Sequence, residues 1–194
     1  WGKTMLGFAG AASYRRDPAL AAWAVERAHA FVREFQTPGG YLSTYAGEDL
    51  LRRNPDDPDA RNHACFNVWG RKYTLWALVE LARTAGGDAE CLAAAERMAD
   101  HLAAQLRRLG LTLDRTGAWH GVSSMSILRP LLELHRLTGS ASARALAEEI
   151  VRMLEDPARR AHYGEQARLR ADTYTPENYR QDLKEILEEV VSGN

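Results

Sequence analysis

The sequence is poor in cysteine, and this excludes two classes of small stabilised domain. Its 194 residues include two cysteines, Cys65 and Cys91, and no Cys-x-x-Cys pair. A disulfide framework or a thiolate zinc site needs more cysteines at closer spacing. We therefore expect no structural metal, no cofactor, and a reducing, cytoplasmic compartment.

The chain also lacks long apolar runs and an excess of charge of either sign. No stretch approaches the roughly 20 apolar residues of a membrane helix, and no basic, apolar leader precedes Trp1. The 25 basic and 26 acidic side chains leave a formal net charge of -1, and many of the arginines occur as dispersed pairs. Without a positive field to hold phosphates, we expect neither a nucleic acid nor a membrane as partner.

The clearest pattern that is present runs from Asn67 to Gly86 and predicts a buried helix. Apolar residues recur there on two stripes, formed by Trp69, Tyr73, Trp76 and Val79 and by Leu75, Leu78 and Ala82. A helix with apolar residues on two sides needs packing partners on both. The rest of the chain should therefore be arranged around it.

Capping residues predict where the neighbouring helices begin. Asp17 followed by Pro18 is typical of a helix start, because the carboxylate accepts from free amides and proline has no amide hydrogen to leave unpaired. The apolar spacing that follows ends near Gln36. Asp88, after two glycines, is the expected cap of the next helix. Pro130 is tolerated only in a first turn, which places a further helix start near Ser124 or Ser126.

An internal repeat indicates how these helices are arranged. ELARTAG from Glu80 and ELHRLTG from Glu133 end two successive helices before short turns. Short turns alternate with two long connections, residues 37–66 and 110–123, so both long connections should lie at one end of the helices. The unit is a helical hairpin, and stacked hairpins form solenoids or closed toroids. The sequence thus predicts an all-α fold.

The tail differs in character from the hairpins. Pro157 begins an arginine-rich helix, and a last helix is expected after Thr175. We therefore expect a helical-hairpin domain over residues 1–155 and a C-terminal helical extension over 156–194.

The end that carries the long connections is rich in flat and polar side chains suited to a carbohydrate. Sugars offer C–H faces that stack on aromatic rings and hydroxyls that accept and donate hydrogen bonds. The stacking candidates are Tyr41, Tyr45, Trp69 and Trp119, and the polar candidates are Lys72, Tyr73, His120 and Ser123. The alternative is that Trp69 and Trp119 are core anchors with satisfied indole donors.

Acid–base and metal chemistry have weaker signals. A glycosidase needs two carboxylates across a cleft, and the connections offer Glu48, Asp49, Asp56, Asp57, Asp59 and Asp114 without distinguishing context. His63-x-Cys65 could begin a metal site, but no second ligand pair follows.

Several motifs, taken in order, resemble one family. They are WGK, GYLSTY after Gln36, VWGRKYTL, MADHL, WHGVSSMSIL and the helix end LxxLTG, spanning about residues 1–152. The chain thereby resembles bacterial glycoside hydrolases that include the β-L-arabinofuranosidases, whose catalytic domain is an (α/α)6 toroid. The resemblance implies about half of such a toroid, since six hairpins close the ring and about three fit here.

The resemblance has departures that affect the expected chemistry. Family members carry acidic residues where this chain has Gly39, Gly40 and Arg129. The family's cysteine nucleophile, glutamate acid/base and metal-binding cysteines lie further along, and neither Cys65 nor Cys91 matches them. The resemblance therefore implies a carbohydrate-active protein that lacks the catalytic residues in this chain.

Two other readings of the sequence remain open. A non-catalytic helical-repeat module would bind a glycan or a partner protein, and LEDPARRAHYGEQAR with YTPENY resembles the closing helices of retaining GT-B glycosyltransferases. The expected partner is a saccharide. Half a toroid also exposes apolar flanks, so a second copy or the remainder of a larger chain should cover them; the start at Trp1 suggests a processed chain or a piece of a longer one.

Overall fold

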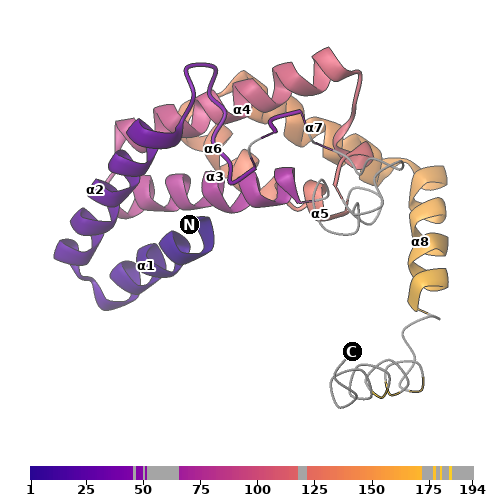
Figure 1. Cartoon of the computed structure of the whole chain (residues 1–194), viewed down its shortest axis with the longest axis horizontal. Helices are drawn as coiled ribbons and strands as arrows, with labels where there is room; N and C mark the ends of the chain where they lie inside the picture. Colours follow the sequence, from indigo (N-terminus) through magenta and orange to yellow (C-terminus); the bar gives the residue numbers. More distant parts are fainter. Residues whose placement is uncertain are drawn as a thin grey trace, which may run out of the picture. The chain divides into compact units, whose positions relative to one another are not determined.

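A computed structural model describes residues 1–45, 47–49, 51, 66–117 and 122–171, with Glu177, Arg180 and Lys184. Within this part the regular elements are helices (Figure 1). They are α1 (Gly2–Arg15), α2 (Pro18–Phe35), α3 (Asn67–Thr84), α4 (Ala89–Leu109), the 3-10 turn η1 (Leu113–Arg115), α5 (Val122–Met125), α6 (Leu128–Thr138), α7 (Ala141–Glu155) and α8 (Pro157–Ala171). The predicted all-α class is confirmed.

The chain divides into two compact units, residues 1–151 and 152–194. The buried apolar core of the first unit draws on α1 to α7 and on three connection residues, Leu42, Leu51 and Leu113. All the candidate site residues predicted from the sequence also have numbers within this unit.

The helix starts expected at Asp17 and Asp88 are confirmed. The Asp17 carboxylate accepts from the Leu20 amide at 3.0 Å with Pro18 in the first turn, and the Asp88 carboxylate accepts from the Cys91 amide at 2.8 Å. Between α1 and α2 the chain reverses at Arg16, whose φ of 52° is left-handed. These caps fix the two tight turns that close the first hairpins.

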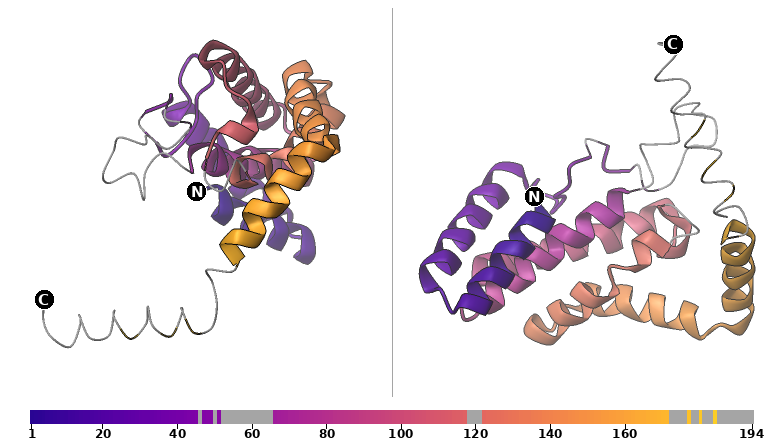
Figure 2. Two further views of the ribbon diagram at one scale, coloured as in Figure 1. Left: turned by 90° about the vertical axis from the view of Figure 1, so that its right-hand side faces the viewer. Right: turned by 90° about the horizontal axis from the view of Figure 1, so that it is seen from below.

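Helix α3 is the central element, as its two apolar stripes predict. It packs against α1, α2, α4, α5 and α6 (Figures 1 and 2). Leu75, Leu78 and Ala82 are buried on one side, while Trp69 and Tyr73 are half-buried on the other. The first turns of α3 therefore stand between α1 and α4.

The start of α6 differs from the sequence prediction. Instead of beginning at Ser124 or Ser126, α6 begins at Leu128 after the short helix α5, and Pro130 lies in its first turn. The Ser126 hydroxyl donates back to the Ser123 carbonyl at 2.5 Å. The N-cap position of α6 is Ile127, and no side chain accepts a capping hydrogen bond there.

The repeat noted in the sequence is visible at the ends of α3 and α6. The Thr84 hydroxyl donates to the Glu80 carbonyl at 2.8 Å, and the Thr138 hydroxyl donates to the Leu134 carbonyl at 3.1 Å. Both helices then pass through a short turn into the next helix, α4 or α7. The helical-hairpin unit is thus confirmed, with α1–α2, α3–α4 and α6–α7 in succession.

The two long connections meet at one end of these hairpins. The Gly117 amide donates to the Leu51 carbonyl at 2.7 Å, joining the connection after α4 to the one after α2. The Leu113 amide donates to the Glu149 carboxylate at 2.7 Å and ties the second connection to α7. The alternation of short and long connections therefore predicted their convergence correctly.

Helix α8 belongs to the second unit, and most of its described side chains are exposed. The Asp156 carboxylate accepts from the amides of Ala158 at 2.9 Å and Arg159 at 3.1 Å, with Pro157 in the first turn. Arg168 pairs with Glu165 along its exposed surface. The expected last helix after Thr175 lies almost wholly outside the described residues.

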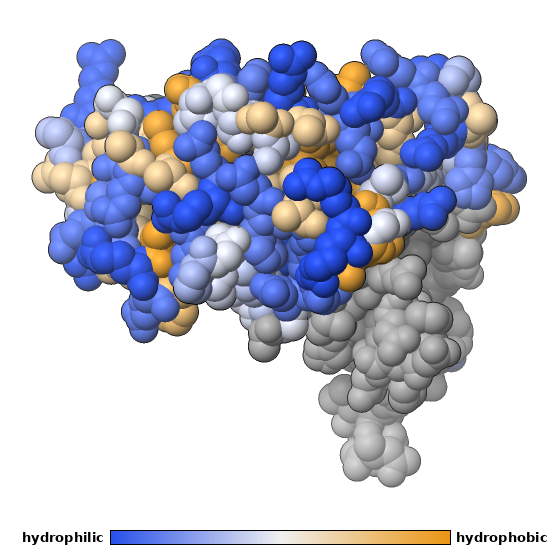
Figure 3. Space-filling view, turned by 90° about the horizontal axis from the view of Figure 1, so that it is seen from above, coloured by the Kyte–Doolittle hydropathy of each residue, from blue (hydrophilic) through white to orange (hydrophobic). Residues whose placement is uncertain are grey.

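The surface of the described part is mixed in polarity. On the face drawn in Figure 3, apolar side chains are scattered among hydrophilic ones. None of the described helices combines the length and the hydropathy that crossing a membrane requires.

Candidate functional site

The first turns of α3 present two groups of functional side chains on different faces. Lys72 and Tyr73 follow Trp69 at helical steps of three and four, and this group faces α1, whereas Asn67 and Arg71 face α4 and the connection after α2. Residues at such steps lie on one side of a helix. We call the first group, with Lys3, the lysine–aromatic cluster, and the second the Arg71 network.

The lysine–aromatic cluster brings two ammonium groups onto the same pair of rings. Trp69 and Tyr73 meet edge to face with centroids 4.9 Å apart. The Lys3 Nζ lies 4.3 Å from the Trp69 centroid and 4.7 Å from that of Tyr73, and the Lys72 Nζ lies 5.3 Å and 3.8 Å from them. These are cation–π distances, each favourable by about 0.5–2 kcal/mol depending on exposure.

The start of α1 is shaped to bring Lys3 to this place. Trp1 stacks on Phe31 of α2 with centroids 4.1 Å apart and planes within 9°. Gly2 touches the α3 backbone so closely that a Cβ atom there would lie 2.4 Å from the carbonyl carbon of Tyr73. The anchored Trp1 and the close approach of Gly2 therefore set Lys3 beside the rings.

The Arg71 network holds the connection after α2 against α3 and α4. The Arg71 guanidinium donates to Asn67 Oδ1 at 2.9 Å, to Gln105 Oε1 at 2.9 Å and to the Glu48 carbonyl at 3.2 Å. Asn67 Nδ2 donates to the Gly47 carbonyl at 3.2 Å, and Gln105 Nε2 donates to the Glu48 carbonyl. This buried cation is retained because each of its three nitrogens meets an acceptor.

Burial and neighbouring groups set the charge states in this network. Burial lowers the pKa of Arg71 to about 10, against the opposing effects of Tyr41, Glu48 and Asp49, so the side chain remains a cation at neutral pH. The pKa of His101 is also lowered, by burial first and by the Arg71 charge second. At neutral pH Arg71 is therefore a cation, and the neighbouring His101 ring favours its neutral form.

The aromatic residues of the connection belong to this network. The Arg71 guanidinium lies 4.4 Å from the Tyr41 ring centroid, and the Tyr41 hydroxyl donates to the Tyr45 carbonyl. Tyr41 is 7% exposed. Its hydroxyl also accepts from Asn67 Nδ2 at 3.5 Å.

The two described carboxylates of this connection are committed to neighbouring side chains of α4. Asp49 pairs with Arg108 at 3.0 Å and accepts from Gln105 Nε2 at 3.1 Å, and these hydrogen bonds lower its pKa. Glu48 Oε2 accepts from His101 Nε2 at 3.2 Å. An ionised, paired carboxylate such as Asp49 is poorly suited to donate a proton to a leaving group.

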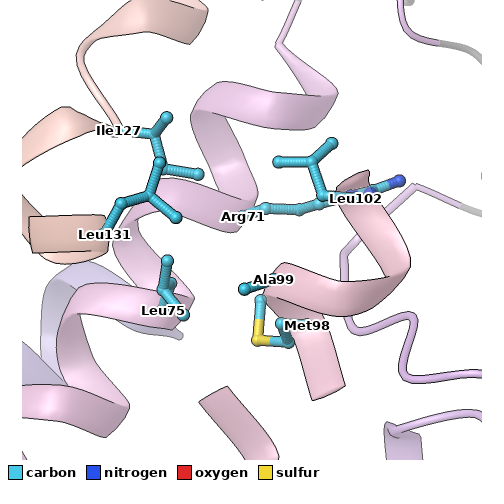
Figure 4. A pocket seen from close by; sticks show the side chains of 7 residues that line it. All are labelled: Arg71, Leu75, Met98, Ala99, Leu102, Ile127 and Leu131. Carbon is cyan, nitrogen blue, oxygen red and sulfur yellow. The ribbon is translucent and has the colours of Figure 1, made fainter. Parts of the chain in front are cut away.

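The pocket next to Arg71 is too small for a sugar. Its volume is about 10 Å³, room for about one water molecule. Apart from the Arg71 stem its lining is apolar, formed by Leu75, Met98, Ala99, Leu102, Ile127 and Leu131 (Figure 4). It is a packing gap between α3, α4 and α6.

A third cluster, at the start of α4, joins metal-ligating side chains. Ligand atoms of His29, Asp88 and Cys91 lie within 4.8 Å of one another. Asp88 accepts from His29 Nε2 at 2.8 Å as well as from the Cys91 amide, and Glu90 lies 3.4 Å from His29 Nδ1. Burial and the adjacent Asp88 raise the pKa of the Cys91 thiol, so hydrogen bonds between α2 and the helix cap explain this cluster without an ion.

Comparison with protein-family models gives one match. The model described as β-L-arabinofuranosidase, GH127 catalytic domain, matches residues 1–189. The chain belongs to this family. Neither curated proteins nor solved structures give a significant match.

Membership of the GH127 family also accounts for the arrangement of hairpins. The all-α unit with three successive hairpins is part of an (α/α)6 toroid, the architecture that the motif resemblance implied. The family match runs to residue 189, beyond the 152 residues covered by the motifs, and so includes α8.

The structure brings some of the predicted site residues together and separates others. Trp69, Lys72 and Tyr73 form one cluster, whereas Tyr41 and Tyr45 lie in the Arg71 network. Ser123 is buried in α5. Trp119 and His120 lie outside the described residues.

Sequence reasoning missed Lys3 and Arg71. Lys3 stands 66 positions before Trp69, and the contact depends on the close approach of α1 to α3, for which the only local signal is Gly2. Arg71 had a local signal, because Asn67 precedes it by four residues and pairs of this spacing share a helix face.

Proposed function

We propose that this GH127-family chain binds a saccharide at the lysine–aromatic cluster and does not by itself hydrolyse it. The observation that carries the proposal is the convergence of Trp69, Tyr73, Lys3 and Lys72 at the end of the hairpins where the long connections meet. Rigid helical scaffolds commonly carry binding groups at such ends.

The cluster offers both kinds of contact that a sugar needs. Trp69 and Tyr73 are half-buried, so part of each ring faces outward. Ammonium groups donate several hydrogen bonds to hydroxyl or ring oxygens. Trp119, His120, Ser123, Tyr41 and Tyr45, which the sequence suggests, are kept in the proposal as candidates for further contacts.

The non-catalytic part of the proposal rests on the described carboxylates and cysteine. Asp49 is paired with Arg108, Glu48 faces His101, and Cys91 is buried with a raised pKa. None of these offers a free nucleophile or a poised acid. The family name suggests a β-L-arabinofuranoside as the substrate class, and we propose it for this chain. We also propose a cytoplasmic location and association with a second copy or with the rest of a longer chain.

The test combines binding and turnover on the full chain. Calorimetry with arabinofuranose-containing oligosaccharides should show binding, and Trp69→Ala should weaken it by roughly 1–3 kcal/mol, the range for aromatic stacking on other flat ligands. Trp23→Ala is the matched control, because Trp23 is 43% exposed on α2 and its described ring contact is with Phe8. Circular dichroism should show both variants folded.

Two results would refute parts of this proposal. Equal affinity in wild type and Trp69→Ala would return Trp69 to the role of a core anchor. Hydrolysis of an aryl β-L-arabinofuranoside that is lost in Glu48→Gln or Asp49→Asn would show that the chain is catalytic and would identify the catalyst.

A further inference from the structure

Two of the three lysines in the sequence meet at the lysine–aromatic cluster. The chain has Lys3, Lys72 and Lys184 against 22 arginines, so lysine is the rare basic residue here. Lys3 comes from α1 and Lys72 from α3, and each ammonium lies within 5.3 Å of both ring centroids. A chain that uses arginine almost everywhere thus places its two compact, strongly hydrated cations together.

Neither ammonium has a counter-charge in the part of the chain that the structure describes. The hydrogen bonds and ion pairs found there include none to Lys3 or Lys72, whose partners are the rings alone. Lys72 is only 6% exposed. Burying an ammonium without an acceptor is costly, and a cation–π contact offsets only part of that cost.

Arg71, the residue before Lys72, is a buried cation whose hydrogen bonds are made within the fold. Arg71 is 2% exposed and donates to Asn67, Gln105 and the Glu48 carbonyl. Lys72 is buried to a similar degree one position later, yet the described structure gives it no oxygen acceptor. The contrast indicates that the Lys72 ammonium is placed to meet an acceptor that the described residues do not supply.

We propose that the saccharide bound at this cluster is acidic, with its anionic group, a carboxylate or a sulfate ester, held between Lys3 and Lys72. This inference rests on the proposed saccharide-binding function and adds the charge of the ligand. The ring faces orient the two ammonium groups, and the anion supplies the acceptor that Lys72 lacks among the described residues. Charge-assisted hydrogen bonds of this kind are about twice as strong as neutral ones.

The experiment measures affinity for saccharides in matched pairs on the full chain. Each pair contains an acidic sugar and its neutral counterpart, such as oligomers of galacturonate and galactose or of glucuronate and glucose, with a sulfated galactose oligomer as a separate arm. Wild type should bind an acidic member roughly tenfold or more tighter than its neutral partner. The preference should shrink as NaCl is raised, because salt screens the charges.

Variants assign the preference to particular lysines. Lys3→Met and Lys72→Met should abolish the preference for the acidic member, Lys72→Arg should keep part of it, and the control Lys184→Met should leave it intact. Lys3 is exposed, so Lys3→Met tests the idea even if Lys72→Met fails to fold. Preference for the sulfated arm over the uronates would identify a sulfate ester as the anionic group.

The outcomes separate this inference from the function on which it rests. If acidic and neutral members bind equally, or if the preference survives in both methionine variants, the inference is wrong while saccharide binding stands. If no member of any pair binds to the folded chain, both are wrong.

Discussion

At the scale of single residues, His101 connects the buried cation of α3 to the surface of α4. Its Nδ1 lies 3.5 Å from Arg71 Nη1, which is a donor, and its Nε2 lies 3.2 Å from the Glu48 carboxylate, which is an acceptor. These partners suit the neutral ring that accepts at Nδ1 and donates at Nε2. Protonation would put a proton on Nδ1 against the guanidinium.

This arrangement predicts a loss of stability in mild acid. Burial and Arg71 hold the pKa of His101 below its ordinary value of 6.5, so the unfolded chain takes up a proton at a higher pH than the folded chain does. The contribution of His101 to stability is therefore complete above pH 6.5 and is lost as pH falls through the lowered folded-state pKa. Urea unfolding of wild type at pH 7.5 and 5.5 measures this change.

His101→Gln isolates that effect from the other histidines. A glutamine amide can still accept from Arg71 and donate to Glu48 but does not titrate in this range. The free energy of unfolding should change less between the two pH values in the variant than in wild type. An equal or larger change in His101→Gln would show that His101 is not the group responsible.

Residue identities alone predicted only the local half of the candidate site. Trp69 and Tyr73 are four positions apart, so their contact follows from helix geometry. The position of Lys3 depends on how two helices pack, and the surroundings of Tyr41 depend on Arg71, which reaches it from another element. Side chains brought together by tertiary packing leave no periodic signal in the sequence.

At the scale of elements, helix starts with a capping carboxylate were predictable and the start of α6 was not. Asp17 and Asp88 each accept from an amide three residues on. Ile127 caps α6 without a side-chain hydrogen bond, and Ser126 bonds back to Ser123 instead. Serine competes between turn and cap, and only the surrounding packing decides between them.

The close packing of α1 on α3 predicts opposite effects for two glycine substitutions in one helix. Gly2→Ala should destabilise the fold by roughly 1–3 kcal/mol, because the new Cβ would meet the α3 backbone at 2.4 Å and force α1 outward. Gly10→Ala should stabilise by up to about 1 kcal/mol, because its Cβ would meet nothing within 4 Å and alanine favours the helix. Thermal or urea unfolding of the two variants compares them directly.

The same pair tests whether α1 positions Lys3. Displacing the start of α1 moves Lys3 off the rings, so Gly2→Ala should also reduce the affinity for an acidic saccharide, whereas Gly10→Ala should not. If Gly2→Ala is as stable as wild type, the close approach of α1 to α3 is incorrect.

At the scale of the whole molecule, the hairpin order was predictable because turn residues recur at the same place in each unit. The Glu80 and Glu133 motifs end α3 and α6 before short turns into α4 and α7. The convergence of the two long connections was predictable from their alternation with short turns, but the particular hydrogen bond that joins them, from the Gly117 amide to the Leu51 carbonyl, was not, since it depends on tertiary packing. The toroid assignment needed the family as well as the repeat, because hairpins alone also fit an open solenoid.

The division of the chain into two units predicts that the hairpin domain is stable without the tail. Among the described residues the last buried apolar side chain is Met153, which precedes Glu155, and the positions of α8 whose burial is described are exposed or half-buried. A chain ending at Glu155 should therefore keep its helix content and unfold cooperatively within a few degrees of the full chain. Circular dichroism melting checks this.

A second truncation gives the matched contrast. Ending the chain at Thr138 also removes α7 and with it the buried side chains of Ala143, Leu146, Ala147 and Ile150. Burial of leucine or isoleucine stabilises by about 1.5–3 kcal/mol each, and whole domains are stable by only about 5–15 kcal/mol, so this loss should abolish or broaden the transition. If ending the chain at Glu155 is as damaging as ending it at Thr138, then the tail is part of the core and the boundary between the two units is misplaced. The lysine–aromatic cluster lies wholly before α7. The chain ending at Glu155 should therefore bind a saccharide with the same affinity as the full chain.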